Sequence, residues 1–117
     1  METAAKGNDW FREMTWGSLV LWAGKIAVTE GRMFQKNGAV KQLTKTGNNG
    51  LLSWVYDEED FAVNVEVDDG ELYGRCGCQG GNVCPHMVAV VIEYIACLKQ
   101  GKHLPVAASN DPRFYLL

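Results

Sequence analysis

The sequence predicts an α+β fold, in which a small antiparallel β meander of about four strands lies between an N-terminal and a C-terminal helix. Three observations favour it. Short apolar segments between residues 39 and 78 are separated by turn residues, and after residue 84 apolar side chains recur at helical spacing. Between these regions, one histidine and three cysteines fall within eleven positions. We interpret them as ligands of one structural zinc ion that staples the sheet to the final helix: Cys76, Cys78, Cys84 and His86.

The N-terminal helix is expected in the apolar stretch that follows Trp10. Ser18 is a candidate N-cap, because its hydroxyl group can accept a hydrogen bond from a free backbone N–H group. Four apolar residues after it recur at helical offsets and should share one face: Leu19, Trp22, Ala23 and Ile26.

The four strands are expected at residues 39–46, Leu51–Tyr56, 61–69 and 71–78. In the third, Phe61, Val63, Val65 and Val67 should face one way, which is typical of a half-buried strand. The residues between them should face the other way: Ala62, Asn64, Glu66 and Asp68. Glycine-containing turns separate the segments, at 37–38, 47–50 and 69–70. Short turns between strands indicate antiparallel neighbours.

The C-terminal helix is expected at residues 85–100. Val88, Val91, Ile92 and Ile95 form an apolar stripe at helical spacing. The residue that begins the helix is a proline, whose missing N–H group costs nothing there, and Gly101 follows its end.

The cysteines and the histidine have the donor types and spacing of a zinc site. Cys76 and Cys78 should point to one face of a strand, and Cys84 and His86 should lie at the start of the helix. Three sulfurs and one nitrogen suit tetrahedral zinc and leave no position for water, which favours a structural ion over a catalytic one. The alternatives are a redox dithiol made by Cys76 and Cys78, or unrelated small residues of a loop.

The pattern C-x-C, five residues, C-x-H, followed by "MVAVVIEYI", resembles the SWIM-type zinc finger. The earlier stretch "GRMFQKNGAVKQL" is also similar to that family, and the resemblance covers roughly residues 15–100. It implies one structural zinc on Cys76, Cys78, Cys84 and His86, and DNA or another protein as partner. Bacterial members often precede a helicase-like ATPase, so such an enzyme, in the same or a neighbouring chain, is a further candidate partner. Pro85 departs from the family pattern, because a basic residue is common there.

This resemblance divides the chain into three parts. Residues 1–14 are expected to be a flexible N-terminus, residues 15–101 the SWIM-type zinc finger domain, and residues 102–117 a C-terminal tail. The apolar end of the tail, at residues 114–117, either covers the core or continues into a region outside this chain.

Charge and hydropathy restrict the function. The net charge of −3 argues against a generic nucleic-acid binder. The longest apolar run, at 87–92, is too short to cross a membrane, and the N-terminus has no secretory pattern, which predicts a cytoplasmic protein. Basic residues nevertheless concentrate in one segment, and four are candidates for nucleic-acid contact: Arg32, Lys36, Lys41 and Lys45. Eight acidic residues and no basic ones lie between Asp57 and Glu71.

We therefore expect a non-enzymatic zinc-binding recognition module for DNA or protein. The alternatives are a protein–protein adaptor that does not bind nucleic acid, and a thiol redox protein using Cys76 and Cys78. The chain has no P-loop sequence and should not hydrolyse ATP by itself. Cys97 is interpreted as a core residue and His103 as a surface residue. The tryptophans are expected in the core or an interface: Trp10, Trp16, Trp22 and Trp54.

Overall fold

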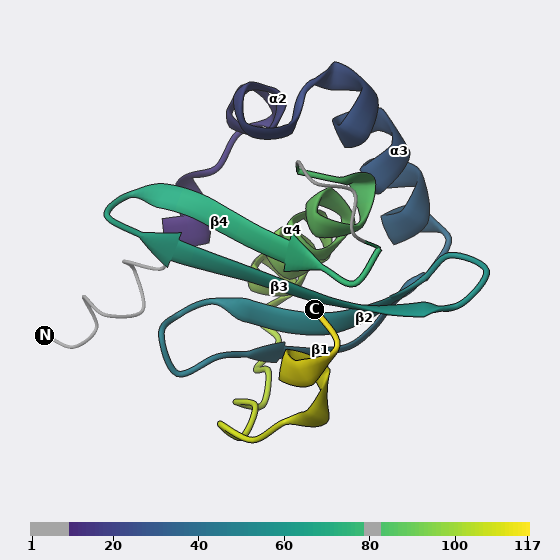
Figure 1. Ribbon diagram of the computed structural model, residues 1–117. Coiled ribbons are helices and arrows are strands. Elements are labelled where there is room, and N and C mark those ends of the chain that lie inside the picture. The colour runs from purple at the N-terminus through teal and green to yellow at the C-terminus, as the bar shows by residue number, and fades with distance from the viewer. Residues whose placement is uncertain (1–9, 79–82) are drawn as a thin grey trace, which may run out of the picture.

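The computed structural model describes residues 10–78 and 83–117, which form one four-stranded sheet with helices across one face (Figure 1). The strands are β1 (Val40–Lys45), β2 (Leu51–Tyr56), β3 (Asp60–Asp68) and β4 (Glu71–Cys76). They pair in the order β1-β2-β3-β4, each antiparallel to the next, so the expected meander is confirmed. The turn between β3 and β4 has two residues, Asp69 and Gly70, with φ angles of 54° and 77°. Such left-handed pairs match the twist of a tight hairpin.

The N-terminal region contains two α-helices where the sequence predicts one. A 3₁₀ helix, η1 (Trp10–Glu13), precedes α2 (Trp16–Ala23) and α3 (Lys25–Lys36). Gly24, between them, has a φ of 88°, which an α-helix does not accommodate. The predicted apolar stripe is therefore wrong beyond Ala23, and Ile26 is 76% exposed whereas Leu19 is 2% exposed.

The N-cap of α2 is Thr15 instead of the predicted Ser18. The Thr15 hydroxyl oxygen accepts a hydrogen bond from the Ser18 backbone N–H at 3.1 Å. Ser18 is the third residue of the helix, and its side chain accepts in turn from the Thr15 backbone N–H. This reciprocal capping box fixes the start of the helix three residues earlier than expected.

The C-terminal helix α4 (Pro85–Gln100) agrees with the sequence prediction at both ends. Gly101 closes it in a left-handed conformation, with a φ of 70°. Helix α3 lies very close to the first turn of α4 at Gly31, which has no side chain. A Cβ atom added at Gly31 would be only 2.7 Å from the Val88 Cβ atom. Among the described residues no helix is both long and apolar enough to pass through a membrane.

The hydrophobic core lies between the sheet and α4 and includes the N-terminal segment. Phe11 is 1% exposed and makes an edge-to-face contact with Tyr94 of α4, with ring centroids 5.2 Å apart. Phe11 therefore packs into the core although it falls within residues 1–14, where a flexible N-terminus is expected; residues 1–9 lie outside the described part. Of the predicted core residues, Cys97 is buried, whereas Trp16 is 49% exposed and Trp10, Trp22 and Trp54 are half-buried; His103 is exposed as expected.

The second face of the sheet is covered by the C-terminal segment, so residues 102–117 belong to the fold. The short helix η2 (Pro112–Tyr115) lies below the sheet in Figure 1 and contacts β2 and β3. Its Arg113 side chain is 6% exposed and donates hydrogen bonds to the Gln42 carbonyl oxygen at 2.6 Å and the Thr44 hydroxyl at 3.2 Å. The central strand β3 is therefore covered on both faces instead of being half-buried as predicted, and Asn64, on the face opposite the valines, is 2% exposed.

Candidate metal centre

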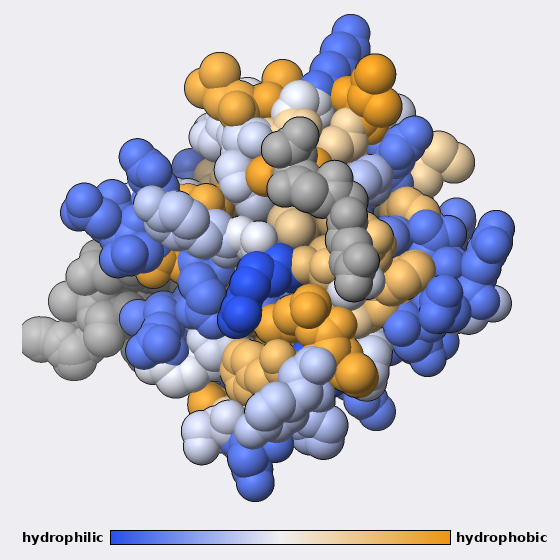
Figure 2. Space-filling model, viewed as in Figure 1, coloured by the Kyte–Doolittle hydropathy of each residue, from blue (hydrophilic) through white to orange (hydrophobic). Residues whose placement is uncertain are grey.

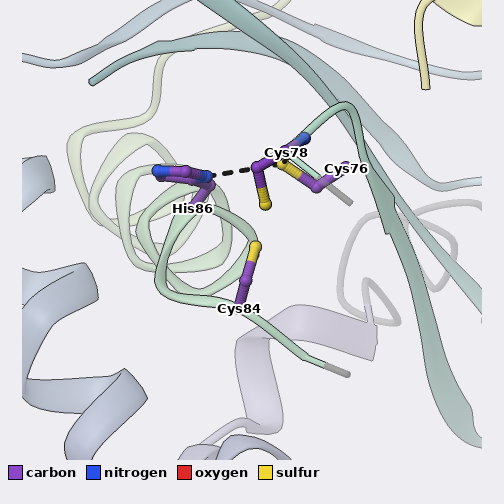
Figure 3. Close-up of side chains that lie close together, drawn as sticks. All are labelled: Cys76, Cys78, Cys84 and His86. Atoms are coloured by element: carbon purple, nitrogen blue, oxygen red, sulfur yellow. Dashed lines mark hydrogen bonds between the residues drawn. The ribbon is translucent and has the colours of Figure 1, made fainter. Parts of the chain in front are cut away.

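Cys76, Cys78, Cys84 and His86 come together where β4 ends and α4 begins. Cys76 is the last residue of β4, Cys78 lies in the following turn, Cys84 is the N-cap of α4 and His86 is in its first turn. Their three sulfurs and one ring nitrogen all lie within 4.8 Å of one another. Figure 3 shows the side chains converging on a shared space between the two elements.

This geometry fits a tetrahedral zinc ion. With ordinary zinc–ligand bond lengths, two sulfurs would be about 3.8 Å apart and a sulfur and a nitrogen about 3.5 Å apart. The Cys76 Sγ atom lies 3.4 Å from the His86 Nδ1 atom. Thiolate sulfur with imidazole nitrogen selects zinc over the hard cations magnesium and calcium, which prefer oxygen ligands. The four residues can therefore hold a metal ion with little rearrangement.

The turn that carries Cys78 contains Gly77, whose backbone is held close to β3 and to the C-terminal segment. The Gly77 N–H donates to the Ala62 carbonyl oxygen at 2.9 Å, which extends the pairing of β3 and β4 by one hydrogen bond. A Cβ atom there would be 2.6 Å from the Leu116 carbonyl oxygen of the C-terminal segment. Cys78 therefore reaches the cluster through a turn, not through the strand alternation that the sequence predicts. The sequence also predicts a tight reversal at Gly80-Gly81, which lies outside the described residues.

The ring of His86 is held from three sides. Its Nε2 atom is 2.8 Å from the Asp57 Oδ2 atom, and Phe61 stacks on the ring with centroids 5.2 Å apart and planes 16° apart. The Phe34 ring of α3 makes an edge contact at 5.2 Å. When the ring is neutral with its proton on Nε2, that N–H donates to the Asp57 carboxylate and the Nδ1 lone pair faces the cysteines. This is the tautomer that a metal ligand needs.

Asp57 is a site residue that the sequence analysis missed. It lies in the hairpin between β2 and β3, 29 positions before His86, among the other acidic residues of that segment. No spacing rule connects a hairpin carboxylate to a histidine on a distant helix. Only its position next to the first turn of α4 distinguishes it from its exposed neighbours.

The protonation of these groups indicates how metal and protons compete. The hydrogen bond with Cys76 lowers the pKa of Cys84 to about 4, and the same contact, together with burial, raises the pKa of Cys76. Burial lowers the pKa of His86, but hydrogen bonds with Cys84 and Asp57 outweigh it and raise the pKa to about 9. The lowered pKa of Cys84 and the raised pKa of His86 favour a thiolate beside a protonated ring, so a metal that binds at Nδ1 competes with a proton there.

The four basic candidates for nucleic-acid contact do not share one environment. Arg32 stacks over the Trp16 ring at 5.5 Å, and Lys41 lies over the Tyr56 ring at 4.9 Å and 3.8 Å from an Asp60 oxygen. Lys45 is partly buried and donates to the Tyr94 hydroxyl at 3.1 Å. Arg32, Lys41 and Lys45 thus make contacts within the domain. Lys36 is exposed in the last turn of α3.

No family model matches this chain, and no curated protein or solved structure matches it either. The metal cluster and the α+β fold therefore stand on the residues and geometry of this chain alone.

Proposed function

We propose that this protein is a non-enzymatic recognition module of SWIM zinc-finger type, whose single zinc ion is structural. The observation that carries the proposal is the convergence of Cys76, Cys78, Cys84 and His86 within 4.8 Å. Four protein donors complete a tetrahedral zinc shell, which leaves no coordination position for a substrate or an activated water molecule. The same ion would engage both thiols on which a redox function would depend.

In this role the zinc ion connects the end of β4 to the start of α4. A structural zinc site supplies on the order of 10 kcal/mol of folding free energy, which is comparable to the whole stability of an ordinary domain. His86 also contacts Phe34 of α3 and Phe61 of β3, so the ion fixes a point where two helices and the sheet meet. The outer surfaces of these elements then remain free for recognition.

A protein partner is better supported than DNA. The net charge is −3, and three zinc-bound thiolates would leave the metal centre itself at −1. Of the four candidate basic side chains, Lys45 is partly buried and donates to Tyr94, and the Lys41 ammonium lies 3.8 Å from an Asp60 oxygen. Arg32 and Lys36 are exposed. Proteins that bind nucleic acid without a basic surface lack the electrostatic contribution that supplies most non-specific affinity.

The test uses two buried cysteines as a matched pair. We expect Cys84→Ser to abolish stoichiometric zinc binding and to lower the melting temperature by about 10 °C or more, which corresponds to a loss of roughly 3 kcal/mol. Cys97→Ser, on the same helix but outside the cluster, should retain one zinc ion per chain. Metal content is measured by atomic emission and stability by thermal melts with and without chelator.

Native protein that contains no metal and melts unchanged in chelator would refute the structural zinc. A salt-dependent affinity for single- or double-stranded DNA, lost in Arg32→Ala and Lys36→Ala, would instead favour a nucleic-acid partner.

A further inference from the structure

A hollow of about 650 Å³ opens between the N-terminal helices and the hairpin of β3 and β4. Its lining residues belong to η1, α2 and the turn at Gly70 with the start of β4, whereas the metal centre lies at the other end of β4. Five large apolar side chains line it: Trp10, Met14, Leu21, Trp22 and Leu72.

These side chains are incompletely covered by the fold. Leu21 is 91% exposed, and the other four are only half-buried. Scattered exposed apolar residues are ordinary on a protein surface, but a group of them around one concavity is typical of an interaction site. In Figure 2, separate hydrophobic patches lie over α2 and α3, and the hairpin of β3 and β4 is largely hydrophilic. The hollow thus offers a place for one or two large apolar side chains of a partner.

The charge at its rim is negative. Glu13 and Glu71 line the hollow, and Asp68 at the end of β3 and Asp69 in the adjoining turn are exposed. None of the lining residues that the structure describes is basic. A partner segment with lysine or arginine beside its apolar residues would therefore be attracted, whereas a phosphate backbone would be repelled.

Two occupants from the same chain fit less well. A second copy placed symmetrically on this surface would bring the same four carboxylates against each other. Residues 1–9 offer one lysine and no large apolar residue except Met1.

We propose that this hollow binds a short segment of a partner protein in which leucine or aromatic side chains are flanked by lysine or arginine. The inference rests on the proposed function as a recognition module, and it names the class of partner. The apolar side chains enter the hollow, and the basic ones face Glu13 and Glu71.

The probe is a fluorescein-labelled amphipathic peptide of leucine and lysine, compared with a copy in which every lysine is replaced by glutamate. Binding is measured by fluorescence anisotropy. We expect the lysine peptide to bind at least tenfold more tightly than the glutamate peptide. Leu21→Ser should weaken the lysine peptide about tenfold, because one large apolar side chain is worth roughly that factor.

Ile26→Ser is the matched control, because Ile26 is also highly exposed but does not line the hollow. It should leave the affinity within twofold of wild type. The double change Glu13→Lys with Glu71→Lys should reverse the preference, so that the glutamate peptide binds better. Zinc content and melting temperature are measured for every variant, so that loss of the hollow is distinguished from loss of the metal centre.

Equal weakening by Leu21→Ser and Ile26→Ser, or equal binding of the two peptides, would overturn the proposal. So would displacement of the peptide by DNA. A variant lacking residues 1–9 that bound the peptide more than tenfold better would show that the chain itself occupies the hollow. Each of these results leaves the zinc-dependent melt unchanged if the metal centre is correctly assigned.

Discussion

At the scale of single residues, the decisive feature is that the two ring nitrogens of His86 have different partners. Nδ1 lies 3.4 Å from the Cys76 sulfur, while Nε2 lies 2.8 Å from the Asp57 carboxylate. A carboxylate that accepts the second N–H of a ligand histidine fixes the ring and increases its basicity. Asp57 is therefore a positioning residue of the metal centre, although it does not touch the metal position.

We expect Asp57→Asn to lower the zinc affinity by about tenfold to a hundredfold, because the ring loses its charged acceptor. The matched control is Glu59→Gln, which removes an exposed carboxylate from the same hairpin. Competition with a chromophoric chelator measures both affinities. If the two variants bind zinc equally well, the role assigned to Asp57 is wrong.

At the scale of elements, close packing of α3 on α4 depends on a glycine. Gly31 faces the first turn of α4, and its missing side chain leaves room for Val88 and the Pro85 carbonyl oxygen. Because His86 is in that same turn and touches Phe34 of α3, the helix contact also supports the metal centre.

Two glycine-to-alanine changes should have opposite signs. Gly31→Ala would place a Cβ atom 2.7 Å from Val88 and 2.8 Å from the Pro85 oxygen, so we expect a loss of about 1–3 kcal/mol. Gly17→Ala in α2 meets only the Thr15 hydroxyl at 3.7 Å and should gain roughly 0.5–1 kcal/mol from helix propensity. Urea unfolding of both zinc-loaded variants measures the difference. Equal effects of the two changes would contradict the close contact.

At the scale of the whole molecule, the sheet is enclosed by different segments on its two faces. Helix α4 covers one face with apolar side chains, and the C-terminal segment covers the other with Arg113. The Arg113 guanidinium also donates to both Asp111 oxygens, at 3.0 and 2.9 Å. This contact lowers the pKa of Asp111, so the carboxylate is charged in the folded protein to a lower pH than in the unfolded chain.

The depressed pKa of Asp111 makes the pH dependence predictable. Its stabilising contribution is complete above the unfolded pKa, near 4, and is lost as the pH falls through the lower folded value. Asp111→Asn should therefore be less stable than wild type at pH 7, by about 1 kcal/mol or more, and the gap should narrow below pH 4. Because both proteins carry the same metal ligands, the difference between their denaturation curves isolates Asp111. A gap that stays constant down to pH 3 would contradict this assignment.

The sequence by itself determined the features that depend on local chemistry. The meander, the bounds of α4 and the cluster of Cys76, Cys78, Cys84 and His86 are local, because strand alternation, caps and ligand spacing involve residues near each other in the chain. Tertiary structure alone decided which side chains meet across long separations. Three features are of this kind: the Asp57–His86 contact, the burial of Asn64 beneath the C-terminal segment and the hollow at Leu21. Each involves segments far apart in the sequence, which no sequence pattern relates to one another. The exposure of Ile26 belongs with them, because the core into which Leu19 packs and Ile26 does not is formed by the rest of the molecule.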